Sequence, residues 1–182
     1  MRATLTTALA AHALTAGTLP AQALVHDTEG WEGDVLTVVD QGTKSYDLPG
    51  AIARWNAAQP PITLQEAPRK ASSCADVDGP CVTVTTGRLE DKVGGRAQGD
   101  YDGGEHITRC HVTLTDKPPK GHGTDMYRTN ILMHELGHCV GLDHAPTGLS
   151  GVNSLMLPHV TGVNTLTAYD LADLHSIYTS AD

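Results

Sequence analysis

The sequence predicts an α+β domain built on a mixed, twisted sheet, with two helices in its last third. Three observations favour this class. Segments rich in β-branched residues occur in the first two thirds of the chain, a single helical pattern interrupts them, and the last third shows only helical patterns and loops. Strand and helix do not alternate regularly, as a doubly wound α/β sheet would require.

The first predicted elements are a strand and a helix. Residues 35–39 alternate weakly and are rich in Val, which predicts a strand. Residues 47–58 place apolar side chains on one helical face, with Asp47 able to cap the first turn and Pro49 within that turn. Pro60 and Pro61 then end the helix, because proline cannot donate the next backbone hydrogen bond.

Three further strands and a loop are predicted in the middle of the chain. Short β-rich runs at Ile62–Gln65 and Cys81–Thr85 lie on either side of a segment of Ser, Asp, Gly and Pro. Gly94–Glu105 is rich in Gly and Asp, which predicts a loop. His106–Leu114 alternates strongly and is rich in β-branched residues, so we expect a strand there.

The last third contains the two remaining helical patterns. One runs from about Asp125 to Val140, and Gly141 can end it in a left-handed conformation. After a loop, Thr167 can cap the last helix, and Asp170 three positions later has the spacing of a capping box. These two helices complete the predicted α+β arrangement.

The first 23 residues are typical of an export signal. Arg2 supplies a positive charge, a stretch of mainly Ala, Leu and Thr follows, and Ala21-Gln22-Ala23 has the small-residue pattern of a cleavage site. We therefore expect a signal peptide at 1–23 and a single secreted, extracellular domain at 24–182. The alternative is an amphipathic N-terminal helix of the folded domain. No other apolar run is long enough to cross a bilayer, so no membrane contact is predicted.

The charge distribution argues against a nucleic-acid partner. The formal net charge is -9, and Lys and Arg form no cluster that could bind phosphates. The acidic segment Asp100–Gly104 could attract Ca²⁺, but a solvated acidic turn is the favoured reading, because calcium needs several convergent oxygens. No pattern indicates an oligomer, so a monomer is expected.

Four cysteines follow the predicted signal, and an even number in an exported chain favours disulfides. They are Cys74, Cys81, Cys110 and Cys139. Three pairings are open. The favoured one joins Cys74 to Cys81 around a short loop and leaves Cys110 with Cys139, which would tie a strand to a helix. Free thiols or a cysteine ligand to zinc are the alternatives, although no C-x-x-C spacing is present.

The residues with the clearest chemical pattern lie between His134 and His144. His134 and His138 are four positions apart on a predicted helix, so they share a face and can reach one zinc ion. Glu135 can reach a water on that ion. Gly141 lets the chain leave the helix, so that His144 can return as a third ligand. Three protein ligands leave one position for water, which is typical of a catalytic site.

This segment resembles the metzincin signature H-E-x-x-H-x-x-G-x-x-H. The chain is similar in particular to matrixin-like zinc metalloproteases of the bacterial secreted type. Ser154–Pro158 resembles their Met-turn, in which Met156 would form an apolar floor below the ligand histidines. The resemblance also implies that Pro158, His159 and Val160 line the substrate pocket. Ala145 departs from the matrixins, which usually have Ser after the third histidine.

The resemblance implies a metzincin-like zincin domain and a zinc-dependent endopeptidase that acts on a protein or peptide. Glu135 would be the general base toward a zinc-bound water. The strand before the zinc helix would form the edge of the cleft, and the substrate would lie extended along it. Two alternatives are a zinc-stabilised binding protein without turnover, against which Glu135 argues, and a zinc hydrolase of a non-protein amide.

Overall fold

A mixed sheet, six-stranded over the residues that the structure describes, forms the centre of the fold. The computed structural model describes residues 12–15, 30–103, 106–117, 124–147 and 152–179. In this part of the chain the strand order is β1-β5-β6-β4-β2-β3. The strands are β1 (His12–Thr15), β2 (Val35–Asp40), β3 (Thr63–Glu66), β4 (Cys81–Gly87), β5 (Val93–Tyr101) and β6 (Ile107–Thr115).

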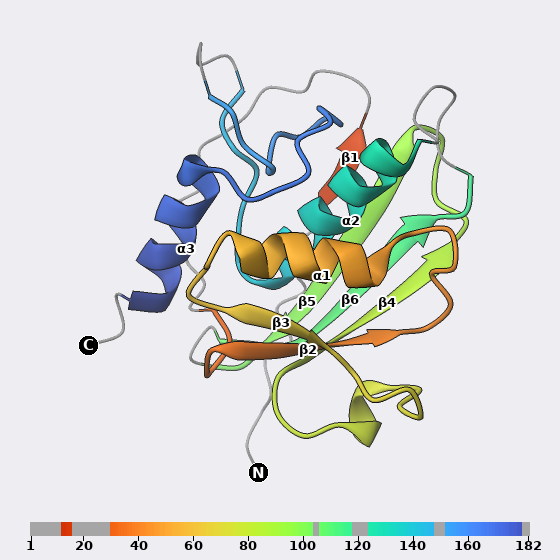
Figure 1. The fold of residues 1–182 in the computed structure, drawn as a ribbon, viewed down its shortest axis with the longest axis vertical. Coiled ribbons are helices and arrows are strands. Elements are labelled where there is room, and N and C mark those ends of the chain that lie inside the picture. Colours follow the sequence, from red (N-terminus) through yellow and green to blue (C-terminus); the bar gives the residue numbers. More distant parts are fainter. Residues whose placement is uncertain (1–11, 16–29, 104–105, 118–123, 148–151, 180–182) are drawn as a thin grey trace.

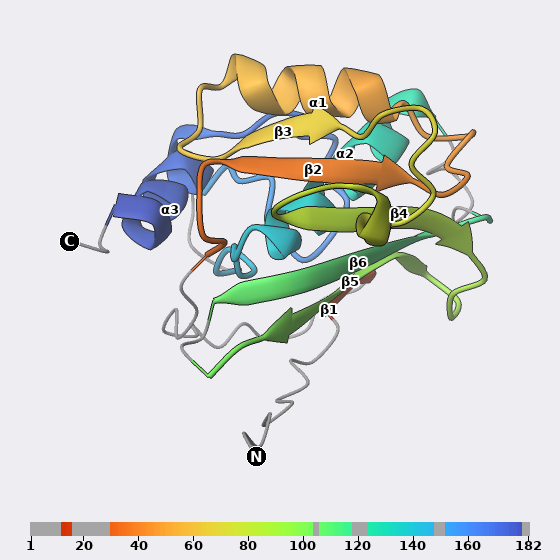
Figure 2. The same ribbon diagram turned by 90° about the horizontal axis from the view of Figure 1, so that it is seen from below.

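The sheet is parallel on one side and antiparallel on the other. Strand β2 is parallel to β3 and β4, and β4 is parallel to β6. Strand β5 is antiparallel to both β6 and β1. Figure 2 shows the twist of the sheet from β3 to β1. The predicted class, α+β with a mixed twisted sheet, is confirmed.

Within the described residues, three α-helices accompany the sheet: α1 (Leu48–Ala57), α2 (Asp125–Cys139) and α3 (Ala168–Thr179). Helices α1 and α2 cover one face of the sheet, and α3 lies to the side (Figure 1). The core lies between this face and the two helices, where Trp55, Val84, Leu114 and Leu136 are fully buried. Burial of such apolar side chains is the main term that stabilises the domain.

The predicted helix caps are confirmed. The Asp47 carboxylate accepts a hydrogen bond of 3.0 Å from the backbone N–H of Gly50, which satisfies one of the free donors of α1. At α3, the Asp170 carboxylate accepts from the backbone N–H of Thr167 at 2.8 Å, and the Asp170 N–H donates to the Thr167 hydroxyl at 3.5 Å. This is the reciprocal pattern of a capping box.

The predicted loop at Gly94–Glu105 is wrong in its first part, because Val93–Tyr101 forms strand β5. Glycine and aspartate disfavour strands on their own, but β5 pairs along its length with β6 and near its start with β1. The glycines also make room for α2: a Cβ built on Gly94 would lie 3.0 Å from Ile131. Close contact with α2 therefore explains why strand β5 contains glycines, which the sequence pattern assigned to a loop.

Strand β6, which precedes the helix that carries His134 and His138, is also not the edge that the resemblance implies for a cleft. Strand β6 lies inside the sheet, between β5 and β4. An interior strand has no free backbone groups to offer an extended peptide. The strand that could offer them is β5, whose outer side pairs, among the described residues, with the four-residue strand β1.

The structure contains two disulfides, Cys74–Cys81 and Cys110–Cys139. They are the favoured pairs of the three possible pairings. The first closes the segment that contains a short 3-10 helix, η1 (Cys74–Asp76). The second joins β6 to the last residue of α2, so it ties the helix that carries the histidines directly to the sheet.

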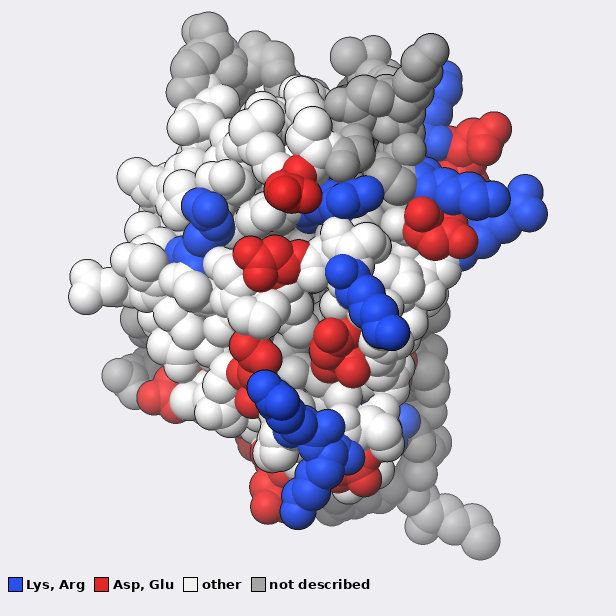
Figure 3. Space-filling model, turned by 45° about the vertical axis from the view of Figure 1, so that its right-hand side comes forward, with Lys and Arg blue, Asp and Glu red and all other residues white. Residues whose placement is uncertain are grey.

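Most of the predicted signal peptide lies outside the described residues; only His12–Thr15 is described, as β1. Cleavage after Ala23 and secretion stay predictions. Among the described residues, no helix combines the length and the apolar character that crossing a membrane requires. On the face shown in Figure 3, Lys and Arg side chains lie among Asp and Glu, without an extended area of one charge.

Candidate active site

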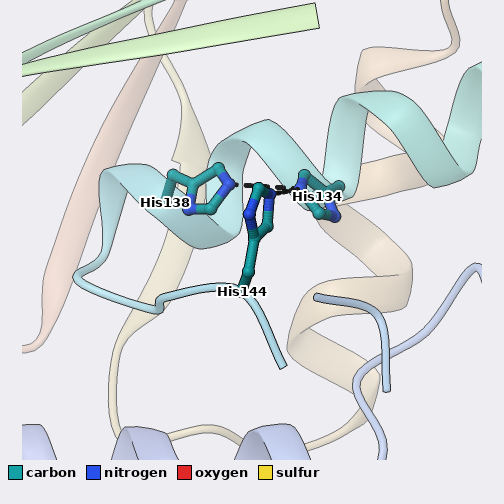
Figure 4. A group of neighbouring side chains, drawn as sticks. All are labelled: His134, His138 and His144. Atoms are coloured by element: carbon teal, nitrogen blue, oxygen red, sulfur yellow. Dashed lines mark hydrogen bonds between the residues drawn. The ribbon is translucent and has the colours of Figure 1, made fainter. Parts of the chain in front are cut away.

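Three histidine side chains converge at the end of α2. His134 and His138 project from the same face of the helix, and His144 reaches them from the following loop (Figure 4). The Nε2 atom of His134 lies 3.1 Å from that of His138 and 3.2 Å from that of His144. Of the described residues, these three form the one group of His, Cys, Asp or Glu that could hold a metal ion.

The backbone after α2 reverses direction and brings His144 to the helix. Gly141 has a φ of 95°, in the left-handed region that favours glycine. The N–H of Leu142 donates to the Gly137 carbonyl at 3.0 Å, and the N–H of Gly141 donates to the His138 carbonyl at 3.1 Å. A side chain at position 141 would strain this turn, so the glycine of the motif is needed to place the third histidine.

Backbone carbonyls orient two of the imidazole rings. The Nδ1 of His134 lies 2.9 Å from the Leu155 carbonyl, and the Nδ1 of His138 lies 2.7 Å from the Leu142 carbonyl. A carbonyl can only accept, so each Nδ1 carries the hydrogen. In the neutral rings the Nε2 atoms are then unprotonated and turn their lone pairs toward one another. This is the usual outer-shell arrangement of a metal-binding histidine.

The donor set fits a metal ion. Lone pairs that face each other across 3.1–3.2 Å repel unless a cation lies between them. Two nitrogens held tetrahedrally at about 2.0–2.1 Å from zinc would be roughly 3.3 Å apart, close to the separations observed. His134 is fully buried, which increases the cost of bringing these lone pairs together without a cation.

Met156 lies against the helix that carries His134 and His138. It is 2 % exposed, and a Cβ built on Gly137 would lie 2.5 Å from the Met156 sulfur. The backbone carbonyl of Met156 accepts a hydrogen bond of 2.8 Å from the N–H of Ala145. The segment around Met156 therefore contacts both the helix and the loop that presents His144.

Asp170 anchors this segment from α3. Its buried carboxylate accepts hydrogen bonds from the Ser154 hydroxyl at 2.5 Å, the Leu155 N–H at 3.0 Å and the Thr167 N–H at 2.8 Å. Since the Leu155 carbonyl in turn accepts from His134, the carboxylate of Asp170 fixes the backbone that orients the first histidine. The capping-box spacing predicted that Asp170 pairs with Thr167, but no sequence pattern predicted its hydrogen bond with Ser154.

We expect Asp170→Asn to lower the free energy of unfolding by about 2–4 kcal/mol, because one carboxylate oxygen would become an amide that faces N–H donors. Urea denaturation followed by circular dichroism measures the change. Asp91→Asn, at an exposed position, is the matched control and should stay within about 0.5 kcal/mol of the unaltered chain. Equal stability of both variants would contradict the anchoring role.

Glu135 lies beside the first histidine and against β5. It is fully buried, and a Cβ built on Gly95 would lie 2.5 Å from its Cγ. Neither carboxylate oxygen makes a hydrogen bond of ordinary geometry. Burial raises the pKa of Glu135 well above its usual value, which the nearby Ala97 N–H and the charge of Arg96 oppose only in part. A buried carboxylate with a raised pKa and no such hydrogen bond is typical of a functional site.

Two residues far away in sequence complete the end of α2. The indole N–H of Trp31 donates to the Cys139 carbonyl at 2.6 Å, and the Tyr178 hydroxyl donates to the Val140 carbonyl at 3.1 Å. These bonds satisfy acceptors that every helix end leaves open. Sequence patterns missed both residues, because neither has a characteristic spacing from the helix.

The other predicted substrate-pocket residues follow Met156 along the chain. Pro158 and Val160 are half-buried and His159 is exposed, and Val160 packs against the core. Their place in a substrate pocket stays a prediction. For calcium, Asp102 accepts a hydrogen bond from the His106 N–H at 3.1 Å, which is an ordinary turn interaction.

Comparisons with known proteins do not assign the chain to a family. No protein-family model and no curated protein sequence matches it. Two solved structures of myroilysin are similar to it, each at 14% sequence identity. One has a TM-score of 0.46 and covers 91% of both chains, and the other has a TM-score of 0.45 and covers 92% of this chain and 91% of its own. At this identity and these TM-scores, neither structure assigns a chemical role to a residue of this chain.

Proposed function

We propose that the chain is a secreted zinc-dependent endopeptidase with a metzincin-like, matrixin-type zincin domain. The observation that carries the proposal is the convergence of three histidine Nε2 atoms, with the buried carboxylate of Glu135 on the same helix. Three protein ligands, where a closed structural site would have four, are typical of a catalytic metal site. A binding protein without turnover would have no use for the carboxylate.

The histidines, Glu135, Met156 and Asp170 would each have a different role in peptide hydrolysis. Zinc, when bound by His134, His138 and His144, would supply Lewis acidity toward water and the scissile carbonyl. Glu135 would accept a proton from the attacking water and pass it to the leaving amine. Its raised pKa makes it a stronger base than an exposed carboxylate. Met156 would form the apolar floor below the three histidines, and Asp170 would fix the backbone that orients His134. Neither residue would contact the substrate.

The substrate backbone would pair with β5. In a chain that lacks residues 1–23, this strand is the edge of the sheet beside Glu135. An extended peptide can add to such an edge through main-chain hydrogen bonds. Pro158, His159 and Val160 would then line the pocket for one of its side chains.

The proposal is tested with the chain from Leu24, zinc-loaded, on casein and a set of quenched fluorescent peptides. We expect hydrolysis that a zinc chelator abolishes and added zinc restores, because the three histidines supply the ion's protein ligands. Bound zinc and an intact fold without cleavage of any peptide would overturn the proposal. In that case amides outside proteins would be the next substrates to test.

A further inference from the structure

Strand β1 occupies the outer side of β5 at one short section. The pairing is antiparallel, with His12 opposite Ala97, Ala13 opposite Arg96 and Thr15 opposite Val93, and the register shifts between Ala13 and Thr15. Figure 1 shows β1, in red, along β5 near α2. The covered section of β5 is therefore residues 93–97.

The same section of β5 packs against the catalytic part of α2. Gly94 lies against Ile131, and Gly95 lies so close to Glu135 that a Cβ at position 95 would clash with the Glu135 side chain. The backbone N–H of Ala97 is near enough to Glu135 to affect its pKa. With β1 in place, Glu135 has no solvent exposure at all. The strand that β1 covers is thus the strand that borders the proposed general base.

The position of β1 is the one an extended substrate would need. An edge strand has a single row of unpaired N–H and C=O groups, and β1 and a substrate would compete for the same row on β5. Residues 12–15 belong to the segment 1–23 that the sequence predicts to be removed. Removal of that segment would free the row.

We propose that residues 12–15 of the uncleaved chain block the substrate-binding edge of β5, so that the N-terminal segment suppresses peptidase activity until it is removed. This inference rests on the proposed function of the histidine site. The blocking element is the backbone of β1, which forms the sheet pairing. Occupancy of the edge for nine-tenths of the time would lower kcat/KM about tenfold, because only the open fraction can bind substrate.

The test compares the full chain with its Ala13→Pro, Leu14→Pro double variant. Consecutive N–H groups of a strand point to opposite sides, so two adjacent prolines remove at least one donor toward β5 whichever residue supplies it. Thr6→Pro with Thr7→Pro makes the same change outside the bounds of β1 and is the matched control. Mass spectrometry verifies that each chain is uncleaved during the assay.

Two quantities are measured: kcat/KM on the quenched peptides, and hydrogen exchange of the backbone amides at 93–97. We expect the Ala13→Pro, Leu14→Pro variant to gain about tenfold or more in kcat/KM and to lose protection at 93–97, while the control matches the unaltered chain. Lost protection without a gain in hydrolysis would overturn the inhibitory role. Unchanged protection would overturn the pairing itself.

Failure of the proposed function would be distinguished by the chain from Leu24. If that chain cleaves peptides while the double variant is no faster than the unaltered full chain, only the inhibition by β1 is wrong. If the chain from Leu24, the full chain and the double variant all cleave nothing with zinc bound, the peptidase proposal fails and the inhibition fails with it.

Discussion

Glu135→Gln lowers kcat for peptide hydrolysis by about 10²–10⁴-fold and leaves zinc bound, because the loss of a positioned general base costs this much. Glutamine keeps the shape of the side chain, which matters at a position with no solvent exposure. Its amide cannot accept the proton of the attacking water. The three histidines are unchanged, so the metal affinity should stay within a few-fold.

The measurement is steady-state kinetics on a quenched peptide, together with the zinc content of the purified protein. Glu66→Gln, at an exposed position on β3, is the matched control and should behave as the unaltered chain. A Glu135→Gln variant that keeps at least half of the unaltered kcat would show that another group takes the proton. Loss of zinc from this variant would show that Glu135 acts mainly through the metal.

His144→Ala is expected to weaken zinc binding by more than the ~10–100-fold that loss of an outer-shell partner costs. The side chain lies 3.2 Å from His134 through the Nε2 atoms, and its removal leaves two of the three nitrogens. Activity should fall with the metal content. Helix α2 should remain folded, because His144 lies after its last residue and Cys110–Cys139 still joins the helix to the sheet.

Competition with a chromophoric chelator measures the zinc affinity, and circular dichroism monitors the fold. His175→Ala removes an exposed histidine of α3 and is the matched control. Equal zinc affinity of the His144→Ala, His175→Ala and unaltered chains would show that the metal site does not include the third histidine. The site would then need a different third ligand.

Local patterns were sufficient for the elements that depend on near neighbours. The spacing of His134 and His138 on one helical face, the reversal at Gly141 and the caps at Asp47 and Thr167 all involve residues within a few positions of each other. Their geometry follows from the helix repeat and from the conformational freedom of glycine, which are the same in every polypeptide chain. The structure has each of these features where the pattern predicts it.

Contacts between distant residues required the tertiary structure. The sequence pattern assigns Gly94 and Gly95 to a loop because glycine disfavours strands, yet both belong to β5, where their lack of a side chain leaves room for α2. In the same way, no pattern shows that Asp170 holds Ser154, or that Trp31 binds the end of α2.

By itself, the sequence determined the α+β class, the helix that carries His134, Glu135 and His138, and the residue types able to bind a metal. Only the tertiary structure decided that β6 is interior, that β5 borders Glu135 and that β1 covers β5. The physical reason is that helical spacing and caps are set by interactions within one turn, whereas strand order depends on which distant backbones exchange hydrogen bonds. Strand order therefore cannot be recognised from a periodic pattern in the sequence.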